Sequence, residues 1–336
     1  MNTEEREKFW DVLKDLHDNS EESMRRLSEV SKLPRFLCRF RSVSENSLQQ
    51  LQENKLFFSS ADYYDDPFDT YFYINYDKLA SDLNKIHKEI SEGKGEIIDK
   101  FSNFVSNTGE SPDKIINALP KEPFEPSIIK DKLRKVRDMV QQGLFSICFC
   151  EDPYNETLWL KYANNYSGFV QIYDFEHSDT ILCGKEEYCQ NCNAAKNFPY
   201  IYPIYYSDEK YDASNYALGK WLIDNILNNN YNFPPNYLNF LINLLTGSIM
   251  WDIERISLIK KKCHENDQEW RMIRPEINKE RSFVKMKPCK IIIGLRTPKY
   301  ERRLIVSAAQ IAGIKEIHEL KINDKDELVS EPITEE

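Results

Sequence analysis

The amino-acid sequence predicts an α+β fold, because segments with strand character are scattered between helical segments in no regular order. Runs of alternating or continuous apolar residues predict strands at 36–41, 55–59, 144–150, 168–175, 200–206, 268–273, 283–286, 289–294 and 315–322. Apolar residues at helical spacing predict short helices at 45–54, 156–164 and 300–312. A doubly wound sheet requires strand and helix to alternate, so the sequence argues against that class.

The chain divides into three expected parts. An N-terminal helical arm is expected at 1–33, where Phe9, Leu13 and Leu16 recur at helical spacing. This arm either packs on its own domain or binds a partner protein, and both interpretations stay open. A single α+β domain is expected at 34–322, and two charged helical blocks, at about 76–142 and 214–264, are interpreted as insertions into it. The acidic segment 323–336 is expected to be a disordered tail.

Composition indicates a soluble globular protein, with 336 residues of which 41% are hydrophobic and 30% charged. The first thirty residues are charged throughout, so we expect no secretory signal, and no run reaches the roughly 20 apolar residues that cross a bilayer. We therefore expect a cytoplasmic protein without a membrane partner. The net charge is −10, although residues 255–303 hold 15 lysines and arginines against 6 acidic residues. This balance argues against general nucleic-acid affinity and allows a local basic cleft.

Two arginines mark the first predicted strand. Arg39 and Arg41 are two positions apart, so both side chains point to the same face of an extended strand. A pair of guanidiniums on one face suits a bidentate grip on phosphate or carboxylate. The alternative is a surface ion pair with Asp66 or Asp69, and the sequence does not separate the two interpretations.

Four ordered motifs carry a resemblance to a known family. They are RFRS at 39–42, FSSADYYDDPFD at 58–69, ICFCEDPYNETLWLKYANNYSGFVQIYDF at 147–175 and QEWRMI at 268–273. Together they resemble the bacterial family called domain of unknown function 2971, over roughly residues 36–320. The chain departs from that pattern at Asp65, where the family has Asn, and at Cys150, where it has Ser.

This resemblance implies a fold and an activity. The order of the motifs is similar to that of ADP-ribosyltransferase-like folds, which implies a mixed, split β-sheet core with large helical insertions. The implied function is that of an NAD-consuming ADP-ribosyltransferase-like effector, in bacterial anti-phage defence or in a toxin system. Protein, nucleic acid and water are all open as acceptors of the ADP-ribose.

The same resemblance implies roles for particular residues. Arg41, together with Arg39, would grip the pyrophosphate of NAD. Glu269 would face the ribose as the catalytic carboxylate, and its substitution by Gln is expected to abolish turnover with thermal stability nearly intact. Further NAD-binding positions are Ser59, Tyr63, Tyr64, Trp159, Tyr162 and Arg271. From the strand pattern alone, a structural pair between Glu269 and Arg271 is an equal alternative.

The spacing of carboxylates, cysteines and histidine allows two possible metal sites. Asp66 and Asp69, with Glu269, would serve a metal-dependent nuclease, although such a carboxylate pair more often caps a turn. The other site would hold a structural zinc, and its ligands are Cys183, Cys189, Cys192 and His177. Free thiols in a loop are the alternative for these cysteines. A non-catalytic adaptor that binds a partner or nucleic acid is the third functional class.

Overall fold

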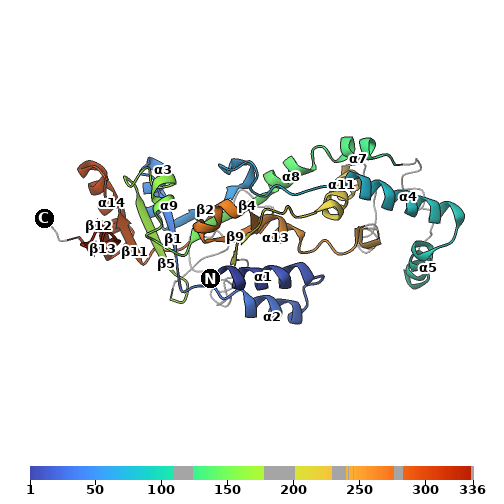
Figure 1. Cartoon of the computed structure of the whole chain (residues 1–336), viewed down its shortest axis with the longest axis horizontal. Coiled ribbons are helices and arrows are strands. Elements are labelled where there is room, and N and C mark those ends of the chain that lie inside the picture. Colours follow the sequence, from blue (N-terminus) through green and yellow to red (C-terminus); the bar gives the residue numbers. More distant parts are fainter. Residues whose placement is uncertain are drawn as a thin grey trace.

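The computed structural model describes residues 1–108, 124–177, 201–228, 240–275 apart from 241 and 245, and 283–333. Within these residues the fold is α+β, as predicted, and it is built on a mixed sheet (Figure 1). The strands follow the order β13-β12-β11-β5-β1-β4-β9-β6, and β3 is added to β4. The sheet is mixed because β11 and β12 are parallel, whereas β5, β1, β4 and β9 run antiparallel to their neighbours.

Each predicted strand segment contains a strand, and the segments 55–59 and 200–206 each contain two short ones. The strands are β1 Phe36–Arg41, β2 Lys55–Phe57, β3 Ser59–Ser60, β4 Leu144–Cys150, β5 Phe169–Asp174, β6 Ile201–Pro203, β7 Tyr205–Tyr206, β8 Ile259–Lys260, β9 Glu269–Pro275, β10 Phe283–Lys285, β11 Lys290–Ile293, β12 Glu316–Ile322 and β13 Leu328–Pro332. The helices are α1 Thr3–Asp15, α2 Glu21–Val30, α3 Glu45–Gln52, α4 Tyr76–Glu92, α5 Glu96–Thr108, α7 Pro126–Leu133, α8 Val136–Gly143, α9 Glu156–Lys161, α11 Ser214–Asn228, α13 Asp252–Ser257 and α14 Lys299–Ile311, with short 3-10 helices η1 Ala61–Tyr63 and η2 Lys262–Asp267.

The sheet splits between β1 and β4. The two strands share one register pair, Cys38 with Cys150, and then diverge. Beyond that pair β1 continues against β5, while β4 continues against β9. On the β1 side of β4, the next described pairing is with β3, at Phe145 and Ser146. The three residues of β4 in between, 147–149, therefore border an opening in the sheet.

The two faces of the sheet carry different residues, because side chains alternate along each strand. On one face, Cys38 and Cys150 pack with Leu158 and Trp159 of α9, and the register places Glu269 beside Cys150. On the other face, Leu37 packs with aromatic residues and with the β2–β10 ribbon. Arg39 and Arg41 alternate with Cys38 and therefore project from this second face, as predicted.

The two helical insertions pack against each other. Leu79 and Leu83 of α4, Leu133 of α7, Val140 of α8 and Leu218 of α11 belong to one buried apolar cluster. In Figure 1 these helices lie at one end of an elongated molecule, opposite the end formed by β12, β13 and α14. The insertions thus form a helical lobe to one side of the split in the sheet.

The N-terminal segment is not a free arm. It forms two helices, α1 and α2, where one long helix or a pair was open from the sequence, and a capping box of Asn2 with Glu5 starts the first. Phe9, Leu13 and Leu27 are 0%, 0% and 1% exposed and pack with residues of β6, β9 and α13. The interpretation of 1–33 as an accessory arm is therefore wrong, because its apolar face is already buried on the domain. That face is not available to a partner protein.

The acidic C-terminal segment is also ordered for most of its length, contrary to the predicted tail at 323–336. Residues Leu328–Pro332 form β13, which pairs antiparallel with β12. The turn before it is held by Asn323, whose side-chain oxygen accepts from the backbone of Lys325 and Glu327. Charge along the strand is neutralised in part, since Lys321 pairs with Glu331 at 2.6 Å. Residues 334–336 lie outside the described residues.

Candidate functional site

A pocket with a cavity volume of about 240 Å³ occupies the split in the sheet. It is lined by residues 38–41 of β1, by Ser146 and residues 148–150 of β4, and by Glu269 and Arg271 of β9. Arg41 and Glu269 thus both line this pocket, although they project from opposite faces of the sheet, and binding of a dinucleotide there stays a prediction. Of the residues predicted from sequence to form the NAD site, those that line this pocket are Arg39, Arg41, Ser59, Tyr63, Tyr64, Tyr162, Glu269 and Arg271.

The carboxylate of Glu269 is buried between two cations. Its Oε1 accepts from Arg271 Nε at 2.5 Å, and its Oε2 accepts from Lys260 Nζ at 2.9 Å. The side chain is only 9% exposed. Burial by itself opposes ionisation, but the guanidinium of Arg271 and the ammonium of Lys260 outweigh it and hold the pKa of this carboxyl well below its usual value. Glu269 is therefore an anion throughout the physiological pH range.

Arg271 is the centre of this buried network. Asp69 accepts from it in a bidentate manner, at 2.9 Å from Nη1 and 2.6 Å from Nη2, and the carbonyl of Ser257 accepts from Nη1 at 2.8 Å. The side chain is 1% exposed, and the ring of Tyr64 lies 5.1 Å from its Cζ. The predicted NAD-binding role for Arg271 is corrected by this geometry. Its N–H groups are used within the protein, so Arg271 positions Asp69 and Glu269.

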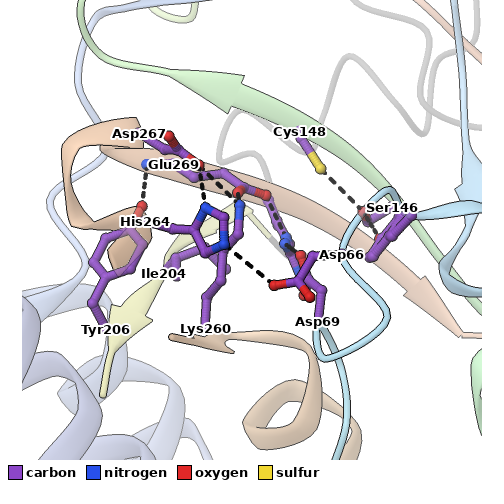
Figure 2. Close-up of polar contacts among 12 residues, drawn as sticks. Asp66, Asp69, Ser146, Cys148, Ile204, Tyr206, Lys260, His264, Asp267 and Glu269 are labelled. Atoms are coloured by element: carbon purple, nitrogen blue, oxygen red, sulfur yellow. Dashed lines mark hydrogen bonds and ion pairs between the residues drawn. The ribbon is translucent and has the colours of Figure 1, made fainter. Parts of the chain in front are cut away.

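The network continues to three side chains that the sequence interpretation missed. Lys260 also donates to Asp267 at 3.0 Å, and His264 lies between two carboxylates, 3.2 Å from Asp66 and 3.6 Å from Asp267 (Figure 2). Lys260 and Asp267 both precede the QEWRMI segment in the sequence. Their proximity to Glu269 in space depends on the 3-10 turn η2, which no pattern in the sequence predicted.

The carboxylates of the expected nuclease site are each held by a cation or a turn. Asp69 binds Arg271, Glu269 binds Lys260 and Arg271, and Asp66 accepts from the backbone N–H of Phe68 at 2.8 Å. Asp66 thus caps a turn, which was the structural alternative. Among the described residues, no group of three or more His, Cys, Asp or Glu side chains is arranged to hold a metal.

Arg39 and Arg41 differ from Lys260 and Arg271 in that no described carboxylate pairs with them. In the part of the chain that the structure describes, neither guanidinium has a carboxylate within ion-pair distance. The alternative of a pair with Asp66 or Asp69 is therefore wrong, because those carboxylates bind His264 and Arg271. Arg39 lies 5.9 Å above the ring of Phe149, and Arg41 Nη2 donates to Gln50 Oε1 at 3.1 Å.

The pKa values of both arginines are lowered, as expected for buried cations without a nearby carboxylate. Burial lowers the pKa of Arg39 below its usual value. Burial, followed by repulsion from Arg39, lowers the pKa of Arg41 to about 10. Both groups remain cations at neutral pH, but the folded state holds them without a described counter-charge. An anionic ligand would supply that counter-charge.

Of the aromatic residues that were predicted to bind NAD by stacking, Tyr63, Tyr64 and Tyr162 line the pocket and Trp159 does not. Tyr63 is 82% exposed and Tyr162 is 37% exposed, and both line the pocket. Tyr64 is more enclosed, and its hydroxyl forms a hydrogen bond with Ser146. Trp159 is corrected from a stacking residue to a core residue, because it is 0% exposed and its Nε1 donates to the carbonyl of Pro153 at 2.9 Å. One turn of α9 separates a buried position from one that faces the pocket.

The proposed zinc ligands are placed only in part. His177 is described, with a side chain 67% exposed and its Nδ1 3.4 Å from Asp174 Oδ2. Cys183, Cys189 and Cys192 lie outside the described residues. The zinc site therefore stays a prediction.

Comparisons with protein-family models, with curated proteins and with solved structures find no match to this chain. Within the described residues, no helix has the length and apolar character needed to cross a membrane. Functional interpretation therefore depends on the geometry of the pocket.

Proposed function

We propose that this protein is an NAD-consuming enzyme of the ADP-ribosyltransferase type, and that NAD binds in the split of the sheet. The observation that carries the proposal is the sharing of one pocket by an ionised, buried carboxylate, Glu269, and two guanidiniums without a described counter-charge, Arg39 and Arg41. NAD presents the complementary pattern, because it joins an anionic pyrophosphate to a cationic nicotinamide riboside.

The charge balance of the pocket supports this orientation. Five lining carboxylates, those of Asp65, Asp66, Asp69, Asp267 and Glu269, lie around three cations, Lys161, Lys260 and Arg271. That part of the pocket is acidic, whereas Arg39 and Arg41 form a basic part. The nicotinamide riboside would lie toward the carboxylates and the pyrophosphate toward the arginines.

Glu269 would act on the bond between nicotinamide and C1′ of the ribose. As that bond breaks, its electron pair leaves with nicotinamide, and positive charge develops on the ribose ring. The carboxylate offsets this charge more strongly in the transition state than in the ground state. Each of its oxygens accepts one hydrogen bond within the protein, and a carboxylate has about four acceptor positions, so it can also accept from the ribose 2′-hydroxyl.

The reaction is completed by an acceptor. A nucleophile adds to C1′ and loses a proton, and water, a protein side chain and a nucleic acid are the acceptor classes that the chemistry allows. Lys260 and Arg271 would keep Glu269 ionised and fix its orientation rather than contact the substrate. The setting in anti-phage defence or in a toxin system, and the membership of the resembled bacterial family, stay predictions.

The size of the cavity sets which part of NAD it encloses. Ligand pockets commonly measure about 300–1,000 Å³, and this cavity measures about 240 Å³. It is suited to the nicotinamide, its ribose and the adjoining phosphate. The adenosine half would lie across the mouth of the pocket, where Tyr63 offers an exposed ring for stacking.

Release of nicotinamide from labelled NAD tests the proposal. The wild-type protein and Arg35→Gln are expected to release nicotinamide, because Arg35 pairs with Asp174 and does not line the pocket. Glu269→Gln and Arg41→Gln are expected to lose about 100-fold or more of that activity. Circular dichroism must show that each variant is folded. Wild-type protein that releases no nicotinamide, alone or with cell lysate as a source of acceptors, would falsify the proposal.

A further inference from the structure

A buried hydroxyl without a partner lies close to the two arginines. Tyr173 on β5 is 0% exposed, and its Oη has no hydrogen-bond partner among the described residues. It is the register partner of Leu37, so it projects from the same face of the sheet as Arg39 and Arg41. An unpaired hydroxyl in such a place costs free energy unless a further group accepts from it.

The pKa shifts of these groups agree with their placement on one face of the sheet. Burial raises the pKa of the Tyr173 hydroxyl, and the charges of Arg39 and then Arg41 oppose that rise. Repulsion between the two guanidiniums also contributes to the lowered pKa of Arg41. The fold therefore gathers two cations and one hydroxyl donor on one face, and their described surroundings contain no anion for them.

We propose that Arg39, Arg41 and the hydroxyl of Tyr173 form a binding site for a diphosphate group. The three groups are donors, and a phosphate is an acceptor that takes several charge-assisted hydrogen bonds at once. Positions two apart on a strand are about 7 Å apart, so each guanidinium can take one of two linked phosphates. This inference rests on the proposed function for the identity of the natural ligand, and it adds Tyr173 as a binding residue.

The hydroxyl of Tyr173 is closed off from solvent, whereas Arg39 and Arg41 are half-buried. Tyr173 is not among the residues that line the pocket, so a diphosphate reaches the hydroxyl only if the side chains around it move. The arginines supply most of the attraction, and the tyrosine adds one donor. Loss of an arginine should consequently weaken binding more than loss of the hydroxyl.

The site also predicts how the free protein responds to substitution. An uncompensated buried cation is a liability in the absence of its ligand, so Arg39→Gln and Arg41→Gln should leave the melting temperature of the free protein unchanged or higher. Tyr173→Phe removes an unpaired hydroxyl at constant shape and should likewise be tolerated. Variants that fold as well as the wild type make the binding measurements interpretable.

Titration with inorganic pyrophosphate, followed by calorimetry and by thermal unfolding, tests the site without NAD. Pyrophosphate is expected to bind the wild type more tightly than inorganic phosphate does, and to raise its melting temperature. Arg39→Gln and Arg41→Gln should each bind at least about 10-fold more weakly, and Tyr173→Phe about 5-fold more weakly. Two matched controls, Arg35→Gln and Tyr154→Phe, lose the same groups outside the pocket and should bind as the wild type does.

The outcomes separate this inference from the proposed function. No binding of pyrophosphate to the wild type, or equal binding by wild type and both arginine variants, overturns the site. If Tyr173→Phe binds pyrophosphate with wild-type affinity, Tyr173 is not part of the diphosphate site. If pyrophosphate binds as expected and no nicotinamide is released from NAD, the diphosphate site holds and the enzymatic proposal fails. If the wild type releases nicotinamide from NAD but both arginine variants bind pyrophosphate as the wild type does, the diphosphate site is wrong, and cleavage of NAD stands without it.

Discussion

Cys38 on β1 and Cys150 on β4 are the register pair at which the two halves of the sheet meet, and the pocket opens beside them. The thiol of Cys38 donates to the carbonyl of Cys150 at 3.2 Å, and both side chains are buried. Past this pair, β1 follows β5 and β4 follows β9. The pocket thus exists because β1 and β4 pair at only one position. Small shifts of β1 should therefore change the shape of the pocket.

Gly168 gives a way to move β1 without touching a pocket side chain. A Cβ at this position would lie 2.1 Å from the carbonyl oxygen of Arg41, a backbone atom that cannot rotate away. We expect Gly168→Ala to displace the end of β1, to destabilise the protein by about 1–3 kcal/mol and to reduce pyrophosphate binding. Urea denaturation and calorimetry measure the two effects.

Gly143 provides the matched control, since nothing lies within 4 Å of a Cβ added there. Gly143→Ala should be neutral or slightly stabilising, because alanine loses less chain entropy on folding. A Gly168→Ala variant as stable as Gly143→Ala would show that the contact between Gly168 and Arg41 does not constrain β1.

Replacing Glu269 should affect stability as well as catalysis. The sequence interpretation expected Glu269→Gln to be nearly neutral, but the structure shows that the carboxylate neutralises buried Lys260 and Arg271. Removing one partner of a buried ion pair costs about 3–5 kcal/mol. The double variant Glu269→Gln with Lys260→Gln removes both charges and should recover part of that loss. Unfolding of the single and double variants in urea measures it, and equal stability of wild type and Glu269→Gln would contradict the buried pair.

Glu254 on α13 predicts a dependence of stability on pH. One of its carboxylate oxygens is buried without a partner among the described residues, and burial raises its pKa to about 7 from 4.5. A pKa raised in the folded state favours folding below the unfolded value and loses that contribution as pH rises from about 4.5 through 7. Glu254→Gln removes the loss, so the variant should be more stable than wild type at pH 8 and similar to it at pH 4.5.

Melting curves at both pH values test this expectation, with Glu7→Gln as the control. Glu7 is an exposed glutamate on α1, and its replacement should shift stability little at either pH. If the difference between wild type and Glu254→Gln is the same at pH 4.5 and at pH 8, ionisation of Glu254 does not affect folding.

The predicted zinc site can be tested by the metal content of the purified protein. If Cys183, Cys189 and Cys192 bind zinc together with His177, the purified protein should contain about one equivalent of the metal. Removal by a chelator should then lower the melting temperature, because binding of a structural metal contributes to folding. Elemental analysis settles the point, and below about a tenth of an equivalent the cysteines are free thiols.

Short-range patterns in the sequence were sufficient to predict much of the fold and part of the candidate site. Alternation along β1 placed Arg39 and Arg41 on one face, and spacing on β9 placed Glu269 beside Arg271. These are relationships between residues two apart, which strand geometry fixes without knowledge of the rest of the chain. The same short-range reasoning failed for Trp159, because a single helical turn carries both a core position and a pocket position.

The sequence by itself thus determined most of the succession of strands and helices, apart from β8 and β13, and the facing of side chains along β1 and β9, since backbone geometry and hydrophobic periodicity act over a few residues. Only the tertiary structure decided that β1 and β4 separate after one register pair, that Lys260 links Glu269 to Asp267 and His264, and that Tyr173 shares a face with the two arginines. It also decided that the N-terminal helices cover their own domain. Such contacts join segments up to hundreds of residues apart, and long-range packing, which selects among many locally acceptable arrangements, leaves no short-range pattern in the chain.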